Sequence, residues 1–215
     1  MIHYDAFFFD FDGVLADSVE VKTRAFATLF EGYGEKVVYQ VIEHHRRHGG
    51  MSRKEKFCYY YKNYLGAEIT DQKLTDLCQK FSQLVVNEVI RSPEIEGAEK
   101  FLKKWYNKIP CFIISAAPDK EIKEIAGQRG LTLYFKVIVG SSDSKQNHLK
   151  NLIKKYDFNP AYCLFFGDAE SDYRAAKACF VNFIGILPGP DAPLLKIDSK
   201  VKWVKHFHEL KSKFE

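Results

Sequence analysis

The stretch AFFFDFDG (residues 6–13) contains the main clue to the fold of this chain. Its first four residues are apolar without a break, which is typical of a strand buried on both faces of a parallel sheet. Asp10 and Asp12 follow directly, and Gly13 comes after them. Because side chains alternate along an extended chain, both carboxylates point to one side and Phe11 to the other. The stretch predicts a buried strand with two acidic groups at its carboxyl end.

Other short apolar runs repeat this pattern further along the chain, with helical periodicity between most of them. The expected strands are 111–114, 137–139, 163–166 and 181–184, and the expected helices are 97–108, 119–129, 145–156 and 170–178. Such alternation predicts an α/β fold, a parallel sheet covered by helices. We expect a last short strand at 201–204 and a closing helix at 205–213.

Residues 17–92 interrupt this alternation, because they show helical periodicity and no convincing strand. Phe57, Tyr60, Tyr61 and Tyr64 recur at helical spacing and are expected to pack as a core stripe. Ser18 is expected to be a capping residue at the start of this segment. The sequence therefore predicts two domains, a core of residues 1–16 and 93–215 and an inserted α-helical cap of residues 17–92.

Composition limits the classes of protein that this chain can be. It has 215 residues, of which 46% are hydrophobic, and a formal net charge of +4. These values are typical of a globular protein and fall short of a dedicated nucleic-acid binder. Five cysteines without a C-x-x-C pair favour a reducing compartment, and no apolar run reaches the roughly 18 residues of a membrane span. We expect a cytoplasmic protein.

Polar side chains follow several of the predicted strands. Ser115 comes after the second strand, Lys145 shortly after the third, and Asp168 and Asp172 after the fourth. Ligands of open parallel sheets bind beyond the carboxyl ends of the strands. These residues are therefore expected to gather with Asp10 and Asp12 around one site.

These motifs resemble those of the haloacid dehalogenase superfamily, in the subgroup that includes phosphoglycolate phosphatases and β-phosphoglucomutases. The stretch DFDGVLADS (residues 10–18) resembles the first motif, Ser115 the second, Lys145 the third and GDAESD (167–172) the fourth. Members of this subgroup insert a helical cap just after the first motif. The resemblance covers the whole chain and implies a Rossmann-like core.

The resemblance also implies phosphoryl transfer with Mg²⁺ as the cofactor. Asp10 would be the nucleophile that forms an aspartyl-phosphate. Asp12 would be the general acid and base, with a pKa that neighbouring carboxylates are expected to raise. The implied metal ligands are Asp10, the backbone carbonyl of Asp12, and Asp168, with Asp172 acting through water or by orienting the other ligands.

Phosphate binding is assigned to three groups by the same resemblance. Lys145 would steady the phosphoryl oxygens and Asp10. Ser115 and the backbone N–H groups of Ala116 and Ala117 would hold the phosphate as a small anion nest. With Asp12 protonated, Asp10, Asp168, Asp172 and Lys145 sum to a charge of minus two, which Mg²⁺ would cancel.

The cap segment 44–56 is the most basic stretch of the chain, and its two glycines predict a loop between two helices. GMSR (residues 50–53) resembles a substrate-contacting string of sugar-phosphate enzymes in the superfamily. Arg53 and then Lys56 are the predicted substrate contacts. Arg46, Arg47 and Lys54 fit a solvated charged face equally well.

The predicted function is hydrolysis of a small phosphorylated metabolite, without nucleic acid or membrane as a partner, by a monomer or weak homodimer. A phosphosugar mutase is the enzymatic alternative. The mutases resemble one another in a histidine of the first cap helix where this chain has Lys22, and in an acidic pair where it has Gly167 and Asp168. A non-catalytic phosphate-binding or regulatory module is the alternative from another class.

Overall fold

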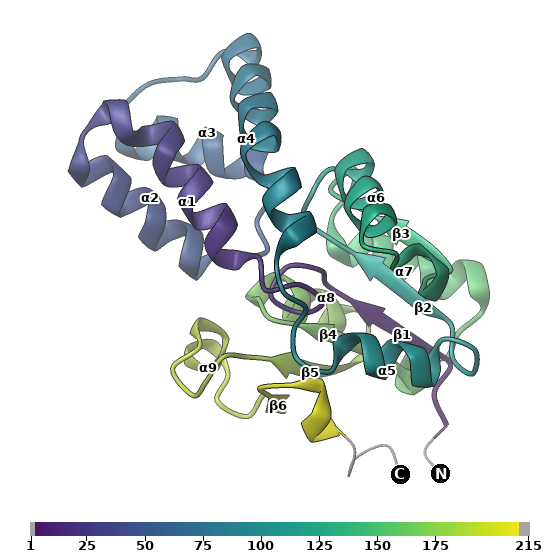
Figure 1. Cartoon of the computed structure of the whole chain (residues 1–215). Coiled ribbons are helices and arrows are strands. Elements are labelled where there is room, and N and C mark those ends of the chain that lie inside the picture. Colours follow the sequence, from purple (N-terminus) through teal and green to yellow (C-terminus); the bar gives the residue numbers. More distant parts are fainter. Residues whose placement is uncertain (1–2, 211–215) are drawn as a thin grey trace.

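The computed structural model describes residues 3–210 and contains one six-stranded sheet, in which every pairing is parallel (Figure 1). The strand order is β3-β2-β1-β4-β5-β6, so β1 lies between β2 and β4. The predicted sheet is confirmed. The strands are β1 (Ala6–Phe9), β2 (Cys111–Ile114), β3 (Val137–Val139), β4 (Cys163–Gly167), β5 (Asn182–Ile186) and β6 (Trp203–Val204).

All four residues of β1 are fully buried because helices cover both faces of the sheet. On one face Phe8 stacks on Phe112 at 5.1 Å between ring centroids, in a cluster with Leu149 and Leu152. On the other face Phe9 stacks on Phe166 at 4.9 Å. The covering helices are α5 (Ala98–Trp105), α6 (Asp119–Gln128), α7 (Lys145–Tyr156) and α8 (Glu170–Ala178), and a short α9 (Pro193–Ile197) lies near the end of the chain.

The cap consists of four helices that stand apart from the sheet at its carboxyl edge (Figure 1). They are α1 (Val19–Phe30), α2 (Glu35–Arg47), α3 (Arg53–Tyr64) and α4 (Asp71–Arg91). Phe26 of α1 lies 5.4 Å from Phe57 and 4.4 Å from Phe81 between ring centroids, and these aromatic side chains belong to the same buried cluster as Phe9 of the sheet. Tyr60 is fully buried, as its helical spacing predicted.

Two chain segments join the cap to the core, and they lie side by side. The N–H of Asp17 donates to the carbonyl of Pro93 at 2.9 Å, and the N–H of Ile95 donates to the carbonyl of Leu15 at 3.2 Å. The expected domain boundaries, 16/17 and 92/93, fall at this paired crossing and stay a prediction.

The expected closing helix is wrong in the part that the structure describes. Residues Phe207–Leu210 form one 3₁₀ turn, and the remainder of the expected helix lies outside the described residues. Phe207 and Leu210 are both buried, and the side chains at i and i+3 of a 3₁₀ turn share one face. Anchoring these two residues therefore favours the tighter turn. Over residues 3–210, no helix is both long and apolar enough to cross a membrane.

Candidate active site

The predicted residues meet at the carboxyl edge of the three central strands. Asp10 follows β1, Ser115 follows β2 and Asp168 follows β4. Lys145, the first residue of α7, reaches the same place, since its ammonium lies 2.9 Å from Asp10 Oδ2. Asp10 and Ser115 are buried at 4% and 1% exposure. The buried ends of neighbouring strands thus bring these groups together.

Lys145 links Asp10 to a second buried carboxylate. Its ammonium donates to Asp172 Oδ1 at 2.6 Å, and the other carboxylate oxygen of Asp172 accepts from the N–H of Ala169 at 3.1 Å. Burial works against the charge of Lys145, but Asp10 and Asp172 outweigh it and raise the pKa of Lys145 above its ordinary value. Lys145 therefore stays a cation beside Asp10.

Three carboxylates crowd the site closely enough to hold one cation. Ligand oxygens of Asp10, Asp168 and Asp172 all lie within 4.8 Å of one another. Burial and the negative charges of the neighbouring aspartates raise the pKa of Asp10 to about 7, against the opposing effect of Lys145. Burial and the charges of Asp10 and Asp172 likewise raise the pKa of Asp168 well above its usual range. A hard divalent cation would relieve this repulsion, so the donor set fits Mg²⁺.

Gly13 makes room for this cluster. Its φ is +75°, and a Cβ at this position would lie 2.4 Å from Asp168 Oδ2. Any other residue would push Asp168 away from Asp10. The glycine of the first motif is therefore required by the close approach of the β1 turn to Asp168.

Asp12 differs from the expectation. Burial alone would raise the pKa of Asp12, yet an ion pair with Lys22 and a hydrogen bond from Ser18 Oγ at 2.6 Å lower it below its ordinary value. The prediction of a raised pKa was wrong because it counted only the neighbouring carboxylates. The first turn of α1 brings a cation to Asp12 that the strand motif does not contain.

Ser18 and Lys22 are therefore site residues that the sequence reasoning missed. Ser18 makes no side-chain capping bond to α1, and its hydroxyl donates to Asp12 instead. Lys22 was noted only as the residue that replaces a histidine. Their spacing of four residues in a helix that begins next to the first motif was the available signal, since such residues share one helix face.

The loop after β2 carries the predicted phosphate-binding groups. Ser115 Oγ accepts from the N–H of Ala117 at 3.1 Å, and the N–H of Ser115 donates to the carbonyl of Val139. In the described conformation the Ala117 N–H is thus engaged by Ser115. Ala116 lines both the larger and the smaller of two neighbouring cavities. The loop borders the space above Asp10.

The predicted cap contacts lie at the interface between cap and core. Arg53 is 6% exposed and forms an ion pair with Glu121 of α6, and Ser82 of α4 bonds to both side chains at 2.6 and 2.8 Å. Lys56 is 1% exposed, and its ammonium lies 2.7 Å from His45 Nδ1. Both residues line the small cavity that also contains Asp10 and Asp12.

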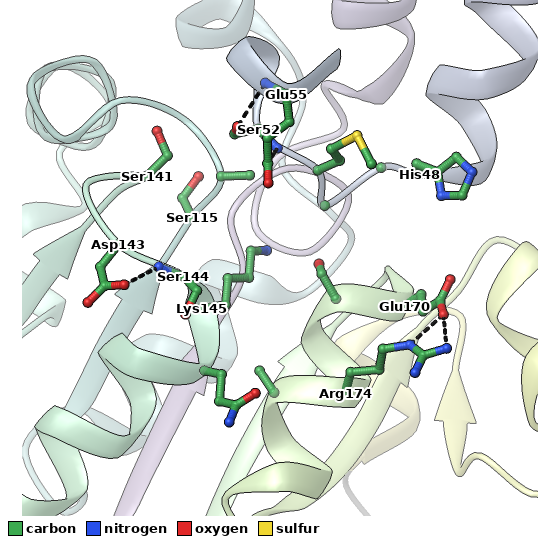
Figure 2. A pocket seen from close by; sticks show the side chains of 17 residues that line it. His48, Ser52, Glu55, Ser115, Ser141, Asp143, Ser144, Lys145, Glu170 and Arg174 are labelled. Atoms are coloured by element: carbon green, nitrogen blue, oxygen red, sulfur yellow. Dashed lines mark hydrogen bonds and ion pairs between the residues drawn. The ribbon is translucent and has the colours of Figure 1, made fainter. Parts of the chain in front are cut away.

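Three hollows reach the site, and one of them, of about 650 Å³, is lined by Gly13, His45 and Asp168. A cleft of about 640 Å³ runs between the cap loop 48–52 and the core, and Figure 2 shows Ser115 and Lys145 on its core side with Ser52 of the cap opposite. A much smaller cavity of about 40 Å³ lies between the cap and the aspartates. The cap loop packs tightly here, since a Cβ on Gly50 would overlap Ser171 Oγ at 1.8 Å. In the described conformation the cap loop is therefore closed against the start of α8.

Comparison with known proteins identifies the family. A family model described as haloacid dehalogenase-like hydrolase matches residues 7–186. The chain belongs to this family. The match includes both halves of the core and the helical cap between them. The family membership that the four sequence motifs predicted is therefore confirmed. This haloacid dehalogenase-like hydrolase is an enzyme.

Known relatives of this hydrolase are distant. Phosphoglycolate phosphatase 1 of Pseudomonas aeruginosa is 26% identical over 210 residues, which cover 89% of this chain and 75% of that protein. The β-phosphoglucomutase of Clostridium difficile superposes with a TM-score of 0.79 at 18% identity, covering 98% and 95% of the two chains. The magnesium-bound HAD-hydrolase YfnB of Bacillus subtilis superposes with a TM-score of 0.69 at 19% identity, with 98% of each chain covered. At these identities the structural similarities establish the fold.

Proposed function

We propose that this hydrolase is a Mg²⁺-dependent phosphatase that transfers the phosphoryl group of a small phosphorylated metabolite to Asp10 and then to water. The observation that carries the proposal is the buried contact of Asp10 with Lys145 at 2.9 Å inside a cluster of carboxylates. A lysine and a cation beside one carboxylate allow a phosphate dianion to approach that carboxylate. The family and the phosphatase among the distant relatives support the same chemistry.

In the first step, one oxygen of Asp10 attacks phosphorus and the bond from phosphorus to the ester oxygen breaks. Lys145 favours the ionised form of Asp10 and holds it in place, and Ser115 borders the phosphate. The ester oxygen needs a proton, which Asp12 would donate. A phosphate dianion next to Asp12 favours its protonated form, because a nearby negative charge raises the pKa of a carboxyl group.

In the second step, water attacks the phosphorus of the aspartyl-phosphate, and Asp12 accepts the proton of that water. Ser18 and Lys22 hold Asp12 as a carboxylate in the free protein, which is the form that a base requires. Asp10, the backbone carbonyl of Asp12, Asp168 and Asp172 would hold Mg²⁺, directly or through water. When bound, the ion would neutralise charge on the phosphate oxygens.

Hydrolysis is favoured over the mutase reaction by the residue that faces Asp12. The mutases that the chain resembles have a histidine at the position of Lys22. Here Lys22 forms an ion pair with Asp12. This departure from the mutase pattern next to Asp12 supports hydrolysis.

The test is Mg²⁺-dependent phosphate release from a panel of small phosphate esters. We expect turnover by the wild-type protein and a loss of at least a thousandfold in Asp10→Asn, since the amide is not a nucleophile. Asp191→Asn changes an exposed aspartate away from the cluster and should retain full activity.

Two results would contradict the proposal. Interconversion of sugar phosphates without phosphate release would identify a mutase. Absence of turnover across the panel, in a protein whose circular dichroism is that of an α/β fold, would favour the binding module.

A further inference from the structure

The cap lines the small cavity with cations. Among the described residues, the titratable cap side chains of this lining are Lys22, His45, Arg53 and Lys56, and the cap contributes no carboxylate to it. The acidic lining comes from the core. A substrate whose phosphate lies against Asp10 would therefore extend its leaving group toward a cationic wall.

Lys56 is the buried cation of this wall that lacks an anionic partner. Lys22 pairs with Asp12 and Arg53 pairs with Glu121. In the part of the chain that the structure describes, no carboxylate lies within ion-pair distance of Lys56, whose polar contacts are His45 Nδ1 at 2.7 Å and the carbonyl of Gly49 at 3.4 Å. A buried ammonium without an anion is unfavourable, so the site is suited to receive one.

Lys56 also has a free hydrogen-bond donor. Burial and the charge of Lys56 lower the pKa of His45 well below its usual value, so His45 is neutral and its Nδ1 accepts from the lysine. An ammonium has three N–H donors, and His45 and Gly49 accept two of them. The third is available to a ligand. Burial and the charge of Lys22 lower the pKa of Lys56 to about 7, and an anion bound beside it would oppose that shift.

The space between Lys56 and the aspartates limits the leaving group. The cavity of about 40 Å³ corresponds to roughly three or four water molecules. Phe26 and Phe81 form part of its wall. Because Asp10 also lines this cavity, a phosphate beside Asp10 takes up part of the space, and a leaving group that reaches Lys56 in this closed conformation must be short.

We propose that Lys56 binds a carboxylate on the leaving group and that the substrates of this enzyme are short phosphorylated carboxylic acids. The inference rests on the proposed phosphatase function and names the substrate class of the same site. His45 orients the ammonium, and Lys56 determines specificity without touching the reacting phosphorus.

The test compares two esters of similar size, 2-phosphoglycolate and 2-hydroxyethyl phosphate, which differ by a carboxylate in place of a hydroxymethyl group. We expect the wild-type kcat/KM to be at least tenfold higher for the acidic ester. Lys56→Met should lower that preference at least tenfold. Lys54→Met, an exposed lysine of the same helix, should retain the wild-type preference. Equal kcat/KM values for the two esters, or an unchanged preference in Lys56→Met, would overturn the inference.

Binding separates this inference from the function on which it rests. Asp10→Asn with Mg²⁺ should bind 2-phosphoglycolate at least tenfold more tightly than 2-hydroxyethyl phosphate in calorimetry, and adding Lys56→Met or Lys56→Gln should remove the difference. Equal affinities in Asp10→Asn overturn the recognition of a carboxylate even if esters are hydrolysed. Tighter binding of the acid without turnover by the wild type supports it and contradicts the phosphatase. Circular dichroism identifies a variant that has not folded. If one of the two substitutions at Lys56 prevents folding, the binding data of the other one test the inference.

Discussion

At the scale of single residues, the site is controlled by which carboxylate has which partner. Asp10 and Asp12 are two residues apart, yet the pKa of Asp10 is raised to about 7 while that of Asp12 is lowered. Burial by itself raises the pKa of both carboxyl groups. The difference arises because Lys22 and Ser18 stabilise the charge of Asp12, whereas Asp10 shares Lys145 with Asp172. Two carboxylates of one motif are thereby given different roles.

Lys22→Met should destabilise the protein most at neutral pH. Since the folded pKa of Asp12 lies below the unfolded value of about 3.9, the ion pair stabilises the fold above about pH 4 and is lost as the pH falls through the folded pKa. We expect the variant to lose about 1–3 kcal/mol at pH 7 and less at about pH 3.

Urea unfolding without Mg²⁺ measures this difference. Lys36→Met, on the exposed surface of α2, serves as the control and should be neutral at both pH values. A deficit for Lys22→Met that is the same at pH 7 and at about pH 3 would show that Asp12 does not titrate with its partner.

At the scale of secondary-structure elements, a buried ion pair fastens the cap to the core. Arg53 at the start of α3 pairs with Glu121 in the first turn of α6, each 6% exposed, and Ser82 of α4 bonds to both. The guanidinium also lies 4.5 Å from the ring centroid of Phe81. Because α6 follows the loop of Ser115 and Ala116, this contact connects cap position to the phosphate-binding loop.

Arg53→Met should cost about 3–5 kcal/mol in the free energy of unfolding, because it leaves Glu121 buried without a counter-ion. The double variant Arg53→Met with Glu121→Leu should recover much of this loss, since an apolar pair needs no compensation. Chemical denaturation measures the free energy of unfolding of the single and the double variant.

The matched control for this prediction is Arg47→Met, which breaks an exposed i,i+4 pair with Glu43. Exposed pairs of this kind contribute about 0.3–0.5 kcal/mol. If Arg53→Met costs no more than Arg47→Met, the contact does not fasten the cap.

At the scale of the whole molecule, one apolar core continues from the sheet into the cap beside a cluster of like charges. Phe9 of the sheet and Phe81 of the cap belong to the same buried cluster, and Asp10, Asp168 and Asp172 lie near the junction of cap and core. The raised pKa values of Asp10 and Asp168 mean that the folded state keeps protons that the unfolded chain has released. Without a metal, stability therefore falls as the pH rises from about 4 through about 7.

Mg²⁺ should raise the melting temperature, and more so at pH 8 than at pH 6, because the carboxyl groups must release their protons to bind the ion. At about a hundredfold excess over the dissociation constant, the increase at pH 8 should be roughly 5–10 °C.

Differential scanning calorimetry with and without Mg²⁺ checks this. Asp168→Asn should abolish the increase and Asp191→Asn should retain it. An equal increase at both pH values, or one that survives in Asp168→Asn, would mean that the ion binds elsewhere.

Much of the fold was predictable from the sequence because the signals were local. Uninterrupted apolar runs indicated the buried parallel strands, and helical periodicity indicated that the inserted segment is helical. The residues around Asp10 were predictable for the same reason, since the carboxyl ends of parallel strands must meet at one edge. The closing helix was wrong because the burial of Phe207 and Leu210 favours a 3₁₀ turn over the local periodicity.

The sequence by itself thus determined the sheet, the helical insertion and the acidic edge of the sheet. Only the tertiary structure decided which side chains the cations contact: Lys22 pairs with Asp12, Arg53 pairs with Glu121 across 68 positions of the chain, and Lys56 donates to neutral His45. The physical reason is that the energy of a charge depends on its distance from other charges and on its burial. Both are set when the cap packs against the core, and no local pattern encodes either of them.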